Sequence, residues 1–262
     1  MSRTTVIAFA NNKGGSGKTT TCSNVGCAMA ALGKKVLLID GDMQMNLTLS
    51  CFDEERSMAF ATGEKNIYTA IKNERDLSDY VTSTDYPGLD MVPSSSLMSA
   101  IEFDLFAKWQ REIILKKCLE PIRARGYYDY ILIDAPPTLG GWVMNVLCAS
   151  DFVVIPVEAS PWGLFGLANM FDFIGQVKNI APKLEVLGIA ITKADERKNY
   201  FKQTVEILRE SGTRLFASYV RVDSTVEWAQ DNSVPVVAYK KYSRSAIEYK
   251  KLAKEIMEYA NR

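Results

Sequence analysis

The chain has 262 residues, of which 47% are hydrophobic and 24% charged, and its formal net charge is zero. This is the composition of an ordinary globular protein with one sizeable core, so we expect a single domain over residues 1–262. The sequence contains no histidine, which excludes Ser-His-Asp and Cys-His nucleophilic sites, histidine-ligated metals and histidine acid/base catalysis. Any reaction must use lysine, carboxylates, hydroxyls, backbone amides or a cofactor metal.

The cysteines and the first residues indicate the compartment. Five cysteines are scattered along the chain without a C-x-x-C pair, which argues against a disulfide framework and a structural zinc site. Met1 to Thr5 run directly into an apolar strand, without the charged and apolar regions of a signal peptide. No apolar run reaches the roughly 18 residues of a membrane span. We therefore expect a cytoplasmic protein with reduced thiols.

Short β-branched runs alternate with helix-length segments. The predicted strands are Thr5 to Ala10, Val36 to Asp40, Leu89 to Val92, Tyr130 to Asp134, Phe152 to Val157 and Leu187 to Thr192. Apolar residues at three and four spacing predict helices, including Thr19 to Leu32 and Leu105 to Arg123. This alternation indicates an α/β fold, a doubly wound, mostly parallel sheet with helices on both faces. In such a sheet, ligands bind beyond the carboxyl ends of the strands.

A glycine-rich segment follows the first predicted strand and leads directly into a helical pattern. Its glycines let successive N–H groups point at phosphate oxygens, and the helix N-terminus adds the positive end of its dipole. Lys18 is expected to neutralise β/γ-phosphate charge, and the Thr19 hydroxyl to ligate Mg²⁺. The residues predicted to bind a nucleotide here are Lys13, Gly14, Gly15, Ser16, Gly17, Lys18, Thr19 and Thr20.

This segment departs from the strict G-x-x-x-x-G-K-[ST] pattern, because Asn12 occupies the first glycine position. It matches the variant K-G-G-x-G-K-[ST], whose additional lysine is Lys13. The alternative is a dinucleotide-binding turn on Gly15 and Gly17, but that motif needs a small residue where Thr20 stands and gives the lysine-threonine pair no role. We therefore prefer the phosphate-loop interpretation to a dinucleotide or merely structural turn.

The variant loop resembles that of the ParA/Soj/MinD group of deviant Walker A ATPases. Residues 40–46 resemble the D-x-D-x-Q-x-N segment of this group, and residues 131–140 resemble its Walker B and switch region. Similarity continues through residues 156–158, 163–166 and 243–256, and is weakest over 52–86. The resemblance implies a P-loop ATPase that uses ATP and Mg²⁺ and forms a homodimer with ATP, closest to small Soj-like partitioning ATPases.

The resemblance gives Lys13 a role between subunits, in which it reaches across the dimer interface to the partner's nucleotide. A second ammonium beside Lys18 is repelled within one subunit, whereas two facing ATP molecules supply compensating negative charge. The alternative is that Lys13 adds to the phosphate site of its own chain.

Carboxylates at strand ends are expected to complete the catalytic site. By resemblance Asp42 positions the attacking water, so catalysis is assigned to Lys13, Lys18 and Asp42. Asp40 is expected to organise the loop. Asp134, which closes a hydrophobic strand, is expected to hold Mg²⁺ through water opposite Thr19, since an unpaired carboxylate is costly there. Its alternative is to cap the following turn of two prolines.

The adenine pocket is assigned by resemblance alone. Thr192 ends its strand where many relatives have Asn, and Pro235 and Val236 lie in a segment whose backbone reads adenine in the family. Residues 192–195 read Thr-Lys-Ala-Asp, so the N-K-x-D guanine motif is incomplete. We therefore expect ATP rather than GTP.

The basic C-terminal segment is the predicted output of the nucleotide switch. Residues 240–254 hold six basic side chains against one acid, Glu248. By itself this pattern fits a solvated surface helix. The resemblance favours sequence-independent DNA binding, which two patches on an ATP-held dimer would make nucleotide-gated and salt-sensitive. The residues expected to contact DNA are Arg221, Lys240, Lys241, Arg244, Lys250 and Lys251.

The function implied is that of a DNA-partitioning ATPase. It would associate with the nucleoid when ATP-bound and be released on slow hydrolysis stimulated by a ParB-like centromere-binding or cargo protein. No helix-turn-helix domain is expected before Thr4. One alternative is a MinD-like membrane- or cargo-positioning ATPase, although the chain stops at Arg262 without an amphipathic tail. Another is an amide-forming synthetase or the nitrogenase iron protein, but neither Cys118 nor Cys148 sits in a matching motif.

Overall fold

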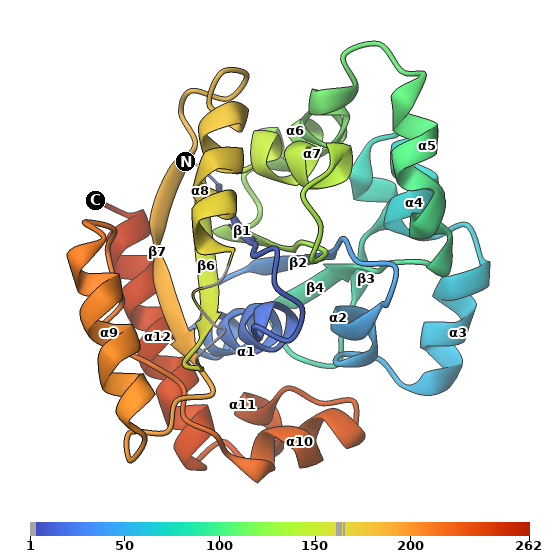
Figure 1. Cartoon of the computed structure of the whole chain (residues 1–262). Helices are drawn as coiled ribbons and strands as arrows, with labels where there is room; N and C mark the ends of the chain where they lie inside the picture. The colour runs from blue at the N-terminus through green and yellow to red at the C-terminus, as the bar shows by residue number, and fades with distance from the viewer. Residues whose placement is uncertain (1–3, 161–163, 165) are drawn as a thin grey trace.

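The computed structural model describes residues 4–160, 164 and 166–262, and in it seven strands form one sheet with helices on both sides (Figure 1). The strand order is β3-β4-β2-β5-β1-β6-β7. The strands are β1 (Thr5–Phe9), β2 (Val36–Asp40), β3 (Thr82–Ser83), β4 (Leu89–Val92), β5 (Tyr130–Asp134), β6 (Phe152–Glu158) and β7 (Glu185–Thr192). All neighbours pair in parallel except β3 and β4. The predicted α/β class is confirmed.

The helices supply the crossovers between these strands and the C-terminal part of the fold. They are α1 (Lys18–Ala31), α2 (Asn46–Leu49), α3 (Glu54–Thr62), α4 (Ile67–Lys72), α5 (Ile101–Phe106), α6 (Ile114–Arg125), α7 (Gly141–Ala149), α8 (Leu167–Val177), α9 (Asn199–Glu210), α10 (Ser224–Asp231), α11 (Val236–Tyr239) and α12 (Arg244–Ala260). Three 3-10 turns are η1 (Leu77–Tyr80), η2 (Ser96–Ala100) and η3 (Arg111–Ile113).

Each face of the sheet has its own core, because successive strand residues point to opposite sides. In β1, Val6 and Ala8 join the core that α4 to α9 complete, whereas Ile7 and Phe9 join the core that α1 and α12 complete. Strands β2 and β5 are buried along their whole length. Burial on both faces is the reason that these strands read as continuous apolar runs.

The predicted helix over Leu105 to Arg123 is wrong in extent. Helix α5 ends at Phe106, and α6 begins only at Ile114, after η3. Gln110, directly before η3, has a φ of 53°, a left-handed conformation that a right-handed helix cannot contain. Both helices contribute apolar residues to one core, so apolar spacing did not reveal the break. The short antiparallel strand β3 was not predicted, and β7 begins two residues before its predicted start.

The carboxyl ends of the central strands lie at one edge of the sheet. Phe9 and Asp40 both pair in register with Asp134. The loop before α1 and the segments after β2 and β5 therefore leave the sheet side by side. This register brings polar residues that are distant in the sequence into one site.

Candidate nucleotide-binding site

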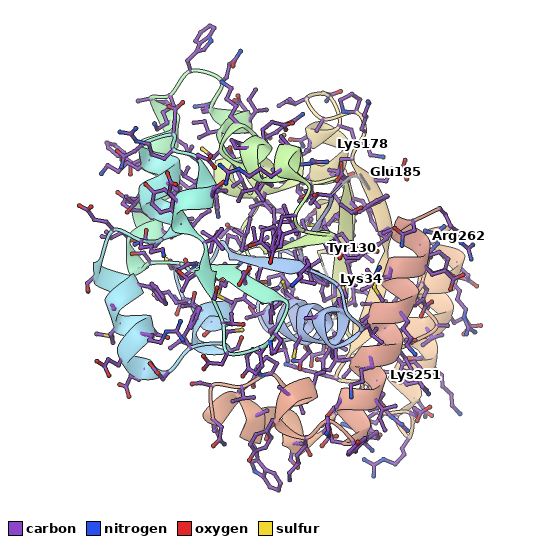
Figure 2. All side chains as sticks on the ribbon, turned by 180° about the vertical axis from the view of Figure 1, so that it is seen from behind. Lys34, Tyr130, Lys178, Glu185, Lys251 and Arg262 are labelled. Atoms are coloured by element: carbon purple, nitrogen blue, oxygen red, sulfur yellow. The ribbon has the colours of Figure 1, made fainter. Side chains whose placement is uncertain are left out.

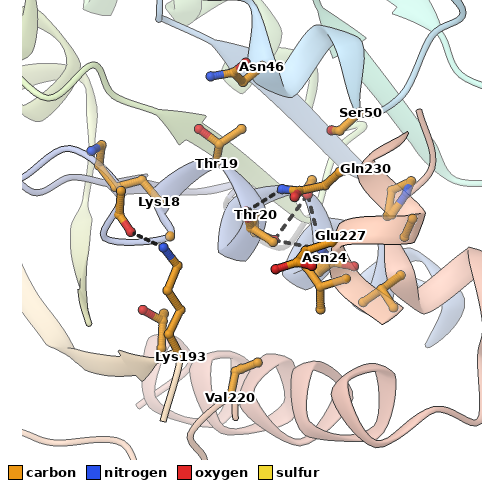
Figure 3. A pocket seen from close by; sticks show the side chains of 18 of the residues that line it. Lys18, Thr19, Thr20, Asn24, Asn46, Ser50, Lys193, Val220, Glu227 and Gln230 are labelled. Carbon is orange, nitrogen blue, oxygen red and sulfur yellow. Dashed lines mark hydrogen bonds between the residues drawn. The ribbon is translucent and has the colours of Figure 1, made fainter. Parts of the chain in front are cut away.

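A cavity of about 790 Å³ opens at this edge of the sheet (Figure 3). Its walls come from the loop before α1, the segments after β2 and β5, the end of β7, and the segment from α10 to α11. Its volume falls in the range of ligand pockets, roughly 300 to 1,000 Å³. The residues predicted for the nucleotide site that line it are Gly14, Gly15, Gly17, Lys18, Thr19, Thr20, Asp42, Thr192, Pro235 and Val236, and Arg221, predicted to contact DNA, also lines it. Lys13, Ser16 and Asp134 are not part of its lining.

The loop before α1 has backbone conformations that favour glycine. Gly15 has a φ of 74° and Gly17 a φ of 83°, and a Cβ on Gly17 would lie 3.2 Å from the Thr192 side chain. A larger residue would be strained at either position. Helix α1 begins immediately after Gly17 without a side-chain cap, so the N–H groups of its first turn are available to an anion.

Lys18 places a buried ammonium beneath this loop. Its Nζ donates to the carbonyl oxygen of Lys13 at 3.2 Å, and the residue is 6% exposed. Burial lowers the pKa of Lys18, although the nearby Asp134 and Asp42 act in the opposite direction. An anionic ligand would favour the charged form and offset this cost.

The Lys13 side chain turns toward the end of β6. Its Nζ lies 3.5 Å from Glu158 Oε2 and 3.4 Å from Ser160 Oγ. This ion pair within the chain was not predicted. The sequence feature that could have indicated it is the position of Glu158 at the end of a strand, at the same edge of the sheet as the phosphate loop. Residues 161–163 and 165, which include Gly163 of the resembling stretch, lie outside the described residues.

Thr19 and Asp134, the two predicted magnesium ligands, are in direct contact. Thr19 Oγ1 donates to Asp134 Oδ2 at 2.6 Å. Asp134 is fully buried, and its Oδ1 has no hydrogen-bond partner in the part of the chain that the structure describes. Burial raises the pKa of Asp134 well above its usual range. A buried oxygen without a partner is costly, and a hard cation bound through water would satisfy it, so these residues fit magnesium.

Asp40 and Asp42 occupy different positions. Asp40 is fully buried and accepts the N–H and hydroxyl of Thr48 at 2.8 and 2.7 Å. It also accepts the N–H of Asp42 at 3.2 Å, and burial raises the pKa of Asp40 to about 6. Asp42 lines the cavity, and its Oδ1 accepts the N–H of Gln44 at 3.0 Å. Of the two carboxylates, only Asp42 therefore faces the ligand space.

The segment from α10 to α11 forms the wall opposite the loop (Figure 3). Gln230 Nε2 donates to Thr20 Oγ1 at 3.1 Å, and the N–H of Val237 donates to Asn24 Oδ1 at 3.2 Å. Asn24, Gln230 and Glu227 line the cavity but were not predicted from the sequence. Single polar residues inside helices form no motif, so only the tertiary contacts reveal them.

Three of the predicted DNA-binding residues are engaged within the chain. Arg221 donates to Glu248 at 2.6 Å and to Glu196 at 3.1 Å. Arg244 donates to the carbonyl of Val222 at 2.5 Å. Lys250 donates to the carbonyl of residue 241 at 2.7 Å. The charge of Arg221 is thus largely balanced by two carboxylates.

The other three predicted residues are exposed. The Lys240 ammonium lies 4.9 Å from the ring centroid of Trp228, and the Lys241 ammonium lies 5.2 Å from that of Tyr242. Lys251 lies on α12, on the side of the molecule seen in Figure 2. These ammonium groups remain open to a polyanion.

Three further findings bear on the alternatives. In the described ranges, no helix combines the length and apolarity that crossing a bilayer requires. All five cysteines, including Cys118 and Cys148, are buried and unpaired. No cluster of three or more potential metal ligands occurs among the residues described.

Known proteins are similar to this chain over nearly its whole length. A family model described as an AAA domain matches residues 4–186. The chromosome partitioning protein ParA of Caulobacter vibrioides is 33% identical, covering 96% of this chain and 93% of that protein. The sporulation initiation inhibitor protein Soj of Bacillus subtilis is 34% identical, covering 96% and 97%.

Two solved structures share the fold. A plasmid partition protein from Borrelia burgdorferi bound to AMPPNP has a TM-score of 0.81 and 25% identity, covering 98% of this chain and 99% of its own. Cobyrinic acid a,c-diamide synthase from Mycobacterium smegmatis, with bound ADP and magnesium, has a TM-score of 0.82 and 25% identity, covering 98% and 96%. Sequence identity to ParA and Soj, at 33% and 34%, is higher than to either of these structures. The variant phosphate loop follows β1, whose last residue pairs in register with Asp134. Together with these similarities, this arrangement shows that the chain belongs to the ParA/Soj family of partitioning P-loop ATPases.

Proposed function

We propose that this chain, as one ATPase domain over residues 1–262, uses Mg²⁺ and ATP to partition DNA. It dimerises with ATP, binds nucleoid DNA without sequence preference, and is released when a ParB-like partner stimulates slow hydrolysis. The phosphate loop carries this proposal. Lys13 and Lys18 flank its glycines, the Lys18 ammonium donates to the Lys13 carbonyl, and the next residue, Thr19, contacts Asp134. The names of the relatives, ParA and Soj, support the partitioning role.

The residues of the cavity divide the chemistry of hydrolysis among them. Magnesium, when bound with ATP, supplies positive charge to the β- and γ-phosphates. Thr19 Oγ1, with Asp134 acting through water, would hold the metal, and a nearby cation favours the ionised form of Asp134. Lys18 adds fixed positive charge at the phosphates, and Asp42 would orient the attacking water.

Lys13 must leave its present partners to serve a neighbouring subunit. Its ion pair with Glu158 is partly exposed, at 25% and 28% for the two side chains, and such pairs contribute about 0–1 kcal/mol. Charge-assisted contacts with a triphosphate are stronger. The exchange of Glu158 for a partner's phosphates is therefore favourable, and it makes ATP part of the dimer contact.

The Lys13→Gln variant tests this proposal. We expect it to retain nucleotide binding but to lose ATP-dependent dimerisation and hydrolysis, because the cation that links the two active sites is absent. Light scattering with ATP, with ADP and without nucleotide measures the dimer, and phosphate release measures hydrolysis. Lys178→Gln, an exposed lysine on the side of the molecule shown in Figure 2, is the matched control.

Two outcomes would contradict the proposal. A Lys13→Gln protein that dimerises fully with ATP would remove the role of Lys13 between subunits. A wild-type protein that sediments with anionic liposomes in ATP, but shows no ATP-dependent retention on DNA, would favour MinD-like positioning instead.

A further inference from the structure

Two consecutive residues at the end of β7 hold two consecutive carbonyl groups of the phosphate loop. Thr192 Oγ1 donates to the Ser16 carbonyl at 2.9 Å, and Lys193 Nζ donates to the Gly15 carbonyl at 2.8 Å. Figure 3 shows the Lys193 side chain reaching the loop from the strand end. The loop is therefore held from outside at two adjacent peptide units.

These bonds fix the direction of the loop amides. In a trans peptide unit, the carbonyl and the following N–H point in opposite directions. Because the Gly15 and Ser16 carbonyls point toward β7, the N–H groups of Ser16 and Gly17 point away from it. These are the donors that a phosphate loop presents to its ligand.

The backbone of Lys193 adds a second observation. Its φ is 49°, a left-handed conformation that costs a non-glycine residue on the order of 1 kcal/mol. The segment is held in place because the N–H of Ala194 donates to the Val220 carbonyl at 3.0 Å, and the N–H of Val222 donates to the Ala194 carbonyl at 3.1 Å. The strained residue thus lies in a fixed frame that directs its side chain back over the loop.

Lys193 contributes a positive charge as well as a hydrogen bond to the loop. Lys193 is exposed and lines the cavity, and its Nζ lies 4.0 Å from the position of a Cβ on Gly15. A charged donor strengthens a hydrogen bond to a carbonyl. Its positive charge at the cavity wall also favours an anionic ligand.

We infer that Lys193 is a positioning residue for the phosphate loop, which acts with Thr192 to hold the Ser16 and Gly17 amides toward the β- and γ-phosphates. This role rests on the proposed nucleotide site. It assigns to the T-K-A-D segment a function in phosphate binding rather than in reading the base. Asp195 is the last residue of that segment. Both of its carboxylate oxygens accept hydrogen bonds from Arg197 at 2.9 Å, so its carboxylate is already engaged within the chain.

Lys193→Met tests the role, because it keeps the unbranched stem and removes the ammonium. We expect affinity for Mg-ADP and Mg-ATP, measured by calorimetry, to fall about tenfold, in line with the loss of a hydrogen bond to a charged group. Affinity for AMP, which lacks the β-phosphate, should remain at the wild-type value. In hydrolysis, KM should rise while kcat changes little, because the loop binds the ground and transition states alike.

Further variants separate positioning from general stability. Lys193→Arg should restore most of the affinity for ADP, because it retains a charged donor. Thr192→Val should weaken ADP binding in a way that is not additive with Lys193→Met, since both residues hold one loop. Lys202→Met, an exposed lysine on α9, is the matched control and should bind ADP as the wild type does.

The inference is overturned if Lys193→Met binds ADP normally, or if it weakens AMP and ADP equally. Failure of the proposed function gives a different result. A wild-type chain that binds ADP but neither hydrolyses ATP nor dimerises with it would refute the proposed function, and the ADP and AMP measurements would still decide the role of Lys193. A wild-type chain that does not bind ADP would overturn both.

Discussion

At the scale of single residues, the site brings together buried carboxylates whose negative charge is only partly balanced within the chain. Asp40 and Asp134 are both fully buried at adjacent strand ends, and the Asp40 carboxylate raises the pKa of Asp134, although less than burial does. Asp40 has three hydrogen-bond donors, whereas one oxygen of Asp134 has none among the described residues. Asp40 therefore orders its own loop, whereas Asp134 has an oxygen that a ligand can contact.

Asp40 should make stability depend on pH. Burial raises the pKa of Asp40 from its ordinary 3.8 to about 6. Because the folded value lies above the unfolded one, the folded state takes up a proton between about pH 4 and 6, and the free energy of unfolding falls as pH rises through this window. The full difference corresponds to about 3 kcal/mol.

Removal of the Asp40 carboxyl group should make the free energy of unfolding depend less on pH. We expect Asp40→Asn to lose less stability than the wild type between pH 4 and 6, as measured by urea denaturation at a series of pH values. Asp172→Asn, an exposed position on α8, serves as the control. Parallel curves for Asp40→Asn and the wild type would show that Asp40 does not titrate in this range.

At the scale of elements, α5 fixes the start of α7, which follows the segment after β5. Glu102 of α5 accepts the N–H of Gly141 and the N–H of Trp142, each at 3.0 Å. A Cβ on Gly141 would lie 2.9 Å from the Glu102 carboxylate, so a larger residue there would displace the end of the Glu102 side chain. The Trp142 indole then donates to the Gly41 carbonyl at 2.8 Å, beside the end of β2. Helix α7 is thus capped by a residue from another element.

Loss of this cap should destabilise the fold. We expect Glu102→Ala to lower the free energy of unfolding by about 1–2 kcal/mol, because two N–H groups at a helix start lose a charged acceptor. Glu102→Gln should cost less, since it retains one acceptor oxygen. Chemical denaturation measures both variants, and Glu206→Ala on the exposed side of α9 is the control. Equal stability of Glu102→Ala and the wild type would disprove the capping role.

At the scale of the whole molecule, the nucleotide cavity and the basic surface share the segment from α10 to α11. Gln230 faces the cavity and contacts Thr20, while Trp228 is half exposed beneath the Lys240 ammonium. If nucleotide binds on one side of this segment and DNA on the other, a shift of the segment on nucleotide binding would also move the DNA-binding lysines. The arrangement supports the proposal that ATP gates DNA binding.

The salt dependence of DNA binding measures how many lysines take part. With ATP present, we expect the double variant Lys240→Gln and Lys241→Gln to bind nonspecific duplex DNA more weakly, because two phosphate contacts are lost. The slope of log affinity against log salt should become shallower by about 2. Filter binding across a salt series measures this, with Lys178→Gln and Lys202→Gln together as the control. An unchanged slope would exclude these lysines from the interface.

Much of this protein could be predicted from its sequence. The α/β class and five of the strands, within one residue at each end, followed from runs of apolar residues, and the phosphate loop followed from glycines and lysines that are contiguous in the chain. Local patterns of this kind survive because backbone geometry and burial act over a few neighbouring residues. The break between α5 and α6 escaped prediction because a single left-handed residue leaves no periodic signal.

The sequence by itself determined that a phosphate loop with an additional lysine follows the first strand and that acidic residues end two further strands. Only the tertiary structure decided which of these groups meet. It paired Lys13 with Glu158, left one oxygen of Asp134 without a partner among the described residues, and brought Lys193 onto the Gly15 carbonyl. These contacts join residues more than a hundred positions apart, and the register of parallel strands, rather than any local preference, sets the distance between them.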